Sequence, residues 1–140
     1  MTFFAKIITL ILAVLAFFGC AKPQPKPTPQ PNTYTVNGDK VEFCFDSNPT
    51  TGFEWNEIHD GDCISLSNSR YVPDKTDKML SGVGGLQYYE FTALHQGTAT
   101  VTFTYIRDFE PDGYKRVFVA EISVDESNNI TVTDFSEQNG

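Results

Sequence analysis

Two alternating runs joined by a short turn decide the fold, and residues 40–58 read KVEFCFDSNPTTGFEWNEI. In residues 40–46 apolar and polar side chains alternate, which predicts a strand with one buried face. Residues 53–58 alternate in the same way and contain Trp55, the only tryptophan of the chain. We therefore expect two strands here, with Trp55 packed in the core between two sheets.

The hexapeptide Asn48-Pro49-Thr50-Thr51-Gly52-Phe53, called the NPTTGF turn below, joins these two runs. Pro49 restricts φ and lacks a backbone donor, so it cannot continue a sheet ladder. Gly52 permits a positive φ, which tight reversals often need. A stiff, exposed turn of this kind loses little entropy on binding a partner. It could equally be a plain connection between strands.

The rest of the chain continues the strand pattern. Further runs lie at residues 64–72, around Tyr89 and Phe91, and at residues 98–106, 117–124 and 130–135. The buried faces are expected to carry Val101, Phe103 and Tyr105 in one run, and Phe118, Ala120, Ile122 and Val124 in another. Short strands with turns at this spacing predict an all-β, immunoglobulin-like sandwich of about seven to eight strands.

Composition limits the classes of partner. The chain of 140 residues has a formal net charge of −8 and an aromatic fraction of 14%. Lys and Arg form no basic cluster, so nucleic acid is not an expected partner. The length suits one domain with a real hydrophobic core, and we expect that domain to be a monomer.

The amino-terminal segment has the pattern of an export signal. Residues 7–18 form an apolar run behind Lys6, too short to span a bilayer and of the length of a signal-peptide core. Gly19-Cys20 follows, which resembles a bacterial lipobox. We expect residues 1–19 to be a lipoprotein-type signal peptide and Cys20 to carry a lipid that anchors an exported protein to the cell envelope or surface. The alternative is ordinary secretion without a lipid.

A proline-rich segment comes next. Residues 22–31 carry proline at every second position, which excludes helix and sheet and favours extended polyproline II. At about 3.1 Å per residue this segment would span roughly 30 Å. We assign residues 20–32 to the lipid-anchored Cys and a linker, and residues 33–137 to the folded domain. A ligand for an aromatic groove is the alternative interpretation of the linker.

Few residues of the folded part suggest chemistry. Cys44 and Cys63 could form a disulfide, worth about 3 kcal/mol in an exported domain, or could remain apart. His59 and His95 are the only histidines, and both are interpreted as loop residues. Because no nucleophile and base can be paired, we predict that the protein is not an enzyme. His59 and Cys63 lack a second pair of ligands at metal-binding spacing, so we also expect no metal or cofactor.

Three loops are expected to gather at one end of the sandwich, because alternate loops of such a topology emerge together. They are the NPTTGF turn, residues 82–85 (GVGG) and residues 107–111 (RDFEP). Glycines let backbone lie flat against a partner. Arg107 and Phe109 are residue types found in binding hot spots. The three loops together favour a binding surface over plain connections.

On these three motifs the chain resembles the chagasin family of cysteine-peptidase inhibitors over residues 36–132. The NPTTGF turn is similar to the family's NPTTG[YF] loop, residues 82–85 to its GxGG loop, and residues 105–110 to its YxRPWE loop. The resemblance implies that residues 33–137 form an immunoglobulin-like inhibitor domain. It also implies reversible, tight inhibition of papain-like cysteine peptidases, host or endogenous, without a covalent bond.

The resemblance also implies roles for individual residues. Thr50 and Thr51 would enter the active-site cleft beside the catalytic Cys. Residues 83–85 would pair with backbone on one side of the cleft, while Arg107 and Phe109 would pack on the other. The implied peptidase-binding residues are Asn48, Pro49, Thr50, Thr51, Gly52, Phe53, Gly82, Val83, Gly84, Gly85, Arg107, Asp108 and Phe109.

One loop departs from the family pattern. Asp108 stands in place of the usual proline and Phe109 in place of the usual tryptophan. Asp108 adds charge and could pair with Arg107, and Phe109 has less area and no indole N–H. We expect this contact to be weaker or tuned to a different peptidase. The alternative function is a non-inhibitory surface module for adhesion or envelope assembly.

Overall fold

The computed structural model describes residues 28, 30–75 and 82–138. The predicted signal peptide, Cys20 and most of the proline-rich linker lie outside the described residues, so they stay predictions. Within the described ranges there is no helix long and apolar enough to cross a membrane.

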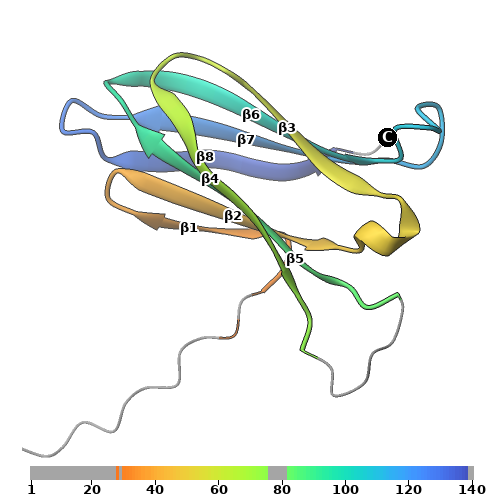
Figure 1. Ribbon diagram of the computed structural model, residues 1–140. Helices are drawn as coiled ribbons and strands as arrows, with labels where there is room; N and C mark the ends of the chain where they lie inside the picture. The colour runs from red at the N-terminus through yellow and green to blue at the C-terminus, as the bar shows by residue number, and fades with distance from the viewer. Residues whose placement is uncertain (1–27, 29, 76–81, 139–140) are drawn as a thin grey trace, which may run out of the picture.

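Eight strands form two four-stranded antiparallel sheets that pack face to face (Figure 1). In one sheet the order is β1 (Thr33–Asn37), β2 (Lys40–Ser47), β5 (Gly85–Ala93) and β4 (Ile64–Pro73). In the other it is β3 (Glu54–Asp60), β6 (Gly97–Ile106), β7 (Arg116–Val124) and β8 (Ile130–Gln138). The predicted all-β sandwich is confirmed.

The core between the sheets is rich in aromatic side chains. On β2, Val41, Phe43 and Phe45 are each 0% exposed, while Glu42 between them is half-buried. The predicted buried faces of β6 and β7 are confirmed in the same way, and their buried residues are Val101, Phe103, Tyr105, Phe118, Ala120, Ile122 and Val124. Strand alternation therefore places the core side chains as the sequence indicates.

Trp55 ties the two sheets together. Its ring stacks on Phe45 at 4.4 Å and on Tyr105 at 4.8 Å between centroids. Its Nε1 donates a hydrogen bond to the Asp46 carbonyl oxygen at 2.8 Å, and the Tyr89 hydroxyl donates to the Trp55 carbonyl oxygen at 2.8 Å. Because Trp55 lies on β3 while Asp46 and Tyr89 lie on β2 and β5, both hydrogen bonds cross between the sheets.

The two cysteines of the folded part are free and buried, so the candidate disulfide is not formed. Cys63 belongs to the core between the sheets. Cys44 points to the opposite face of β2 from Phe43 and Phe45, as its place in the alternation predicts. The two thiols are thus separated by a sheet, and burial raises the pKa of each.

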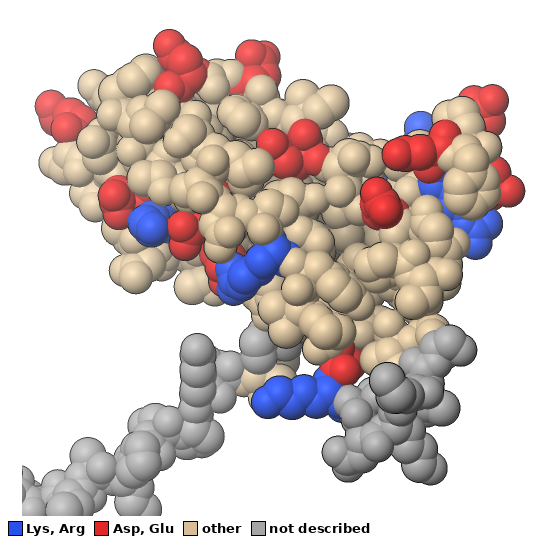
Figure 2. All heavy atoms as spheres, viewed as in Figure 1, with Lys and Arg blue, Asp and Glu red and all other residues tan. Residues whose placement is uncertain are grey.

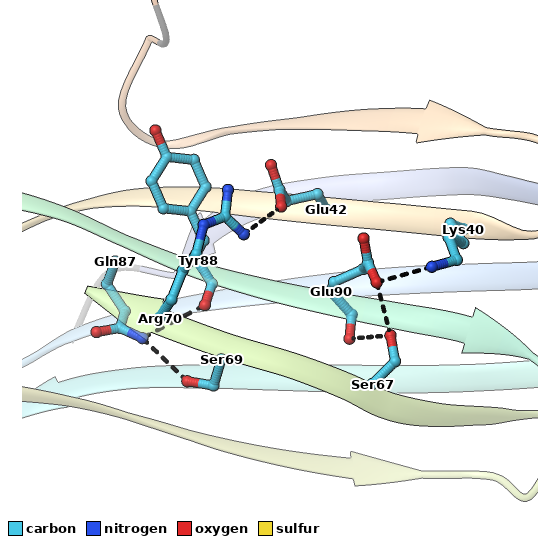
Figure 3. A network of polar contacts seen from close by, with 8 residues as sticks. All are labelled: Lys40, Glu42, Ser67, Ser69, Arg70, Gln87, Tyr88 and Glu90. Atoms are coloured by element: carbon cyan, nitrogen blue, oxygen red, sulfur yellow. Dashed lines mark hydrogen bonds and ion pairs between the residues drawn. The ribbon is translucent and has the colours of Figure 1, made fainter. Parts of the chain in front are cut away.

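Polar side chains cover the outer face of the β1-β2-β5-β4 sheet (Figure 3). Arg70 pairs with Glu42 at 2.6 Å, and its guanidinium lies 4.1 Å from the centre of the Tyr88 ring. Lys40 pairs with Glu90 at 3.1 Å. These pairs make the face compatible with water, so the sheet needs no further layer on this side.

The Tyr89 hydroxyl makes the free energy of unfolding depend on pH in the alkaline range. Burial, reinforced by the charges of Glu57 and Glu54, raises the pKa of Tyr89 from 10.0 to about 12. The unfolded chain releases this proton at a lower pH than the folded chain. The contribution of Tyr89 is therefore complete below its unfolded pKa and is lost as the pH rises toward its folded pKa, by about 1.4 kcal/mol per pH unit.

We predict that Tyr89→Phe lowers the free energy of unfolding by about 1–2 kcal/mol at neutral pH, because the buried Trp55 carbonyl loses its donor. The difference in free energy of unfolding between the parent and Tyr89→Phe should disappear near pH ~11, because the parent has by then lost about 1.4 kcal/mol of stability through the Tyr89 hydroxyl. Urea unfolding followed by Trp55 fluorescence at both pH values measures it. An equal difference at neutral and alkaline pH would contradict the role given to Tyr89.

Candidate functional site

Three loops lie together at one end of the sandwich (Figure 1). They are the NPTTGF turn between β2 and β3, residues 82–84 before β5, and the β6–β7 loop. The Asn48 amide Nδ2 donates to the Gly82 carbonyl oxygen at 3.2 Å, and Arg107 Nε donates to the Thr51 carbonyl oxygen at 3.1 Å. The NPTTGF turn is thus bonded to both of its neighbours.

The backbone of the NPTTGF turn forms one closed 3-10 turn over Pro49–Thr51. The Thr51 N–H donates to the Asn48 carbonyl oxygen at 3.1 Å, and the Gly52 N–H donates to the Pro49 carbonyl oxygen at 3.0 Å. Gly52 ends the turn with a φ of +80°. Proline at the start and glycine in a left-handed conformation at the end are the roles that the sequence predicts for them.

Asn48 organises the turn from within. The Thr50 hydroxyl donates to Asn48 Oδ1 at 2.6 Å, and the Thr51 hydroxyl donates to the Asn48 carbonyl oxygen at 2.7 Å. The Asn48 N–H in turn donates to the Tyr105 hydroxyl at 3.0 Å. Both threonine hydroxyls are therefore satisfied inside the turn, and the turn is attached to the core through Tyr105.

Arg107 braces the turn from the β6–β7 loop. Besides its hydrogen bond to Thr51, its guanidinium lies 4.4 Å from the centre of the Phe53 ring, and its Nη1 pairs with Glu110 Oε2 at 3.1 Å. Arg107 thus pairs with Glu110, and not with Asp108 as the sequence analysis considered. The Glu110 N–H donates to the Arg107 carbonyl oxygen at 3.0 Å, and this turn brings the Glu110 side chain to Arg107.

An aromatic stack continues from this brace into the core. Phe53 stacks on Tyr105 with centroids 5.1 Å apart, and Tyr105 stacks on Trp55. Phe53 is half-buried in this stack, so it supports the turn from behind. Phe109, in contrast, is 71% exposed, and its ring edge lies where it would be 3.0 Å from a Cβ added to Gly52.

The glycine loop, residues 82–85, contains glycines that differ in exposure and in packing. Gly82 is exposed and has a φ of +92°. The Gly84 carbonyl oxygen accepts a hydrogen bond from the Asp74 N–H at 3.0 Å. Gly85 is buried in β5, where an added Cβ would clash with the Val72 carbonyl oxygen and would lie 2.7 Å from the Tyr71 hydroxyl. Gly85 therefore serves the packing of β4 on β5, and its predicted contact with a peptidase stays a prediction.

Exposure divides the thirteen predicted residues into an exposed set and a supporting set. The exposed ones are Pro49, Thr50, Thr51, Gly82, Asp108 and Phe109. The half-buried ones are Asn48, Gly52, Phe53, Val83, Gly84 and Arg107, and Gly85 is buried. The sequence analysis missed Tyr114, which is 68% exposed and lies 6.0 Å from Phe53. Its position after the Asp112-Gly113 turn of the same loop is the signal that could have found it.

The surface charge agrees with the acidic composition. Asp and Glu side chains are spread over the face seen in Figure 2, whereas Lys and Arg are few. Both signs meet at the end that carries the β6–β7 loop, where Arg107 neutralises Glu110. Asp108 in the same loop is exposed.

The histidines lie away from this end. His59 is in β3, which extends to Asp60 by pairing with Thr100, and it contacts Glu57 at 3.1 Å. The interpretation of His59 as a loop residue is therefore wrong. His95 lies 3.5 Å from Asp62. Among the residues that the structure describes, His, Cys, Asp and Glu form no group of three that could hold a metal ion.

Comparison with known proteins identifies the family of this chain. Residues 34–122 match the family described as chagasin family peptidase inhibitor I42. That match covers more than half of the chain, so the chain belongs to the chagasin family of peptidase inhibitors.

Particular relatives agree with this class. Chagasin of Trypanosoma cruzi is 34% identical over 76 residues, which are 50% of this chain and 66% of chagasin, just under two thirds of its length. The crystal structure of the cysteine protease inhibitor EhICP2 from Entamoeba histolytica has a TM-score of 0.54 at 23% identity, over 63% of this chain and 80% of that one. The solution structure of amebosin has a TM-score of 0.52 at 27% identity, over 65% and 85%.

We predict that Gly85→Ala lowers the free energy of unfolding by about 1–3 kcal/mol, because the added methyl group overpacks the contact between β4 and β5. Gly84→Ala is the matched control, because its Cβ would meet only the Ser47 carbonyl oxygen at 3.3 Å and the Asp74 carboxylate at 3.8 Å. Urea unfolding of the two variants measures the difference. Equal stability of both would show that Gly85 has no special packing role.

Proposed function

We propose that the protein is a reversible, tight-binding inhibitor of papain-like cysteine peptidases whose three loops occlude the active-site cleft. The observation that carries the proposal is the NPTTGF turn itself, which is closed by its own hydrogen bonds and braced by both neighbouring loops. Membership of a peptidase-inhibitor family supports it. The cysteine protease inhibitor EhICP2 shares the fold.

The arrangement suits a cleft. Pro49, Thr50 and Thr51 form the exposed tip of the turn. The backbone of residues 82–84 lies on one side, where it could pair with an extended strand of the peptidase. The exposed aromatic ring of Phe109 lies in the loop on the other side. Because the loops are bonded to one another before contact, little conformational entropy remains to be lost on binding.

The inhibition acts by occupation of the cleft. The tip presents small side chains whose hydroxyls are already bonded to Asn48. Such a tip enters a narrow site with little desolvation of polar groups. The target's catalytic thiol is covered and is not modified, so activity returns when the complex dissociates.

The amino-terminal segment would determine where the inhibitor works. We propose that residues 1–19 direct export and that Cys20 carries a lipid, so residues 20–32 tether a monomeric inhibitor to the cell envelope or surface. The apolar run of residues 7–18 and the alternating prolines support this arrangement. Secretion without a lipid is the other outcome that lipid labelling of Cys20 would reveal.

The first test is a titration of papain and of a cathepsin-type peptidase with residues 32–140, which contain all eight strands. Stoichiometric inhibition that reverses on dilution is expected. Thr51→Arg should weaken inhibition roughly 100-fold or more, about 2.8 kcal/mol, because a long charged side chain cannot enter the cleft with the tip. Thr131→Arg is the control, since Thr131 is exposed on β8 at the opposite end and should leave inhibition unchanged.

The outcome separates the two functions. Parent-like inhibition by Thr51→Arg would contradict the placement of the NPTTGF turn in the cleft. If the parent itself leaves both peptidases active at micromolar concentration, the non-inhibitory surface module becomes the better account.

The side chain of Phe109 tests the β6–β7 loop separately. Phe109→Ala should raise the inhibition constant about tenfold, because an exposed aromatic contact of about 1.4 kcal/mol is removed. Phe109→Trp should inhibit at least as tightly as the parent, because the larger ring has more area to bury. Both effects are measured as inhibition constants against papain. An unchanged constant for Phe109→Ala would place the β6–β7 loop outside the interface.

A further inference from the structure

Both sides of one peptide group in the NPTTGF turn are already hydrogen-bonded within the protein. The Thr51 carbonyl oxygen accepts from Arg107 Nε at 3.1 Å. The Gly52 N–H of the same peptide donates to the Pro49 carbonyl oxygen at 3.0 Å. Thr51 is exposed at the tip, so this peptide bond would lie where a bound peptidase could attack.

We propose that Arg107 is a positioning residue that protects the Thr51–Gly52 peptide bond from cleavage by the peptidase it blocks. The inference rests on the proposed function, which places the NPTTGF turn in the cleft. It assigns to Arg107 an internal role that differs from the contact with the peptidase expected from the sequence.

Cleavage would require the Thr51 carbonyl to turn toward the enzyme. The peptidase thiolate adds to the carbonyl carbon, and the C=O electron pair moves to oxygen, which must face the donors of the oxyanion hole. Collapse of this adduct expels the Gly52 nitrogen, which takes a proton from the peptidase's acid, and leaves a thioester. Water then hydrolyses the thioester and restores the thiol. While the oxygen is bonded to Arg107, it points into the inhibitor and away from those donors.

Arg107 is held in place for this role by contacts besides its hydrogen bond to Thr51. Its guanidinium faces the Phe53 ring at 4.4 Å and pairs with Glu110 at 3.1 Å, in addition to the Thr51 hydrogen bond. A planar, always charged group with several donors can make these contacts at once.

The neighbouring glycine makes such a restraint necessary. Gly52 has a φ of +80° and no Cβ, so the peptide plane between Thr51 and Gly52 meets little steric resistance to rotation. Without Arg107, the remaining hydrogen bond from Gly52 to Pro49 belongs to a single 3-10 turn, which opens easily. The hydrogen bond from the distant β6–β7 loop is what keeps the carbonyl turned inward.

The test compares Arg107→Gln with Glu110→Gln. Glu110→Gln removes the ion pair but keeps the hydrogen bond from Arg107 to Thr51, so it is the matched control. Each protein is incubated with papain at equimolar and at catalytic ratios, and its mass is followed over hours. The parent and Glu110→Gln should stay intact. Arg107→Gln should be cut between Thr51 and Gly52, with gain of one water, about tenfold faster or more, and its inhibition should decay with time.

Two results would overturn the inference. In one, Arg107→Gln stays intact and only binds more weakly, which would make Arg107 a contact residue. In the other, cuts appear at many bonds, which would indicate general loosening. Circular dichroism checks the fold, and Arg107→Lys, which keeps a charged donor, should be cut more slowly than Arg107→Gln. Failure of the parent to inhibit papain would contradict the proposed function, whereas a cut of Arg107→Gln confined to the Thr51–Gly52 bond, and absent from the parent, would still support the protection by Arg107.

Discussion

Stacking of aromatic rings on Trp55 holds the rest of this molecule in place. Phe45 stacks on Trp55 in the core, and Tyr105 stacks on Trp55 as well. Phe53 stacks on Tyr105 at the loop end, where the Arg107 guanidinium covers the Phe53 ring. The indole also hydrogen-bonds from one sheet to the other. The geometry of the sandwich and that of the NPTTGF turn therefore depend on the same set of contacts.

In these loops, the residues that hold the NPTTGF turn in place differ from the residues that are exposed to a partner. The half-buried Asn48 and Arg107 satisfy backbone and hydroxyl groups of the NPTTGF turn, and its exposed residues Pro49, Thr50 and Thr51 form a tip with small side chains. The ordering of the turn takes place when the protein folds, so a partner meets a surface that is already organised. The identities of Asp108 and Phe109 are not part of this support, because Arg107 pairs with Glu110.

The cysteines show how far alternation along a strand can be trusted. Alternation correctly predicts that Cys44 lies on the outer face of β2, since side chains on β2 alternate without interruption. It says nothing of Cys63, which lies just before β4 and turns into the core. The geometry of a disulfide depends on where two segments meet, and here a sheet lies between the thiols.

The sequence by itself determined seven of the eight strands, the buried faces of β2, β6 and β7, the conformational roles of Pro49 and Gly52, and the order of motifs that indicates the family. These properties follow from alternation and φ preferences of residues close together in the chain. The sequence did not indicate β1 (Thr33–Asn37). Only the tertiary structure decided that Gly85 is a packing glycine and that Arg107 binds Thr51, 56 residues away. Contacts of that kind depend on strand pairing and on how the two sheets pack, which no local pattern encodes.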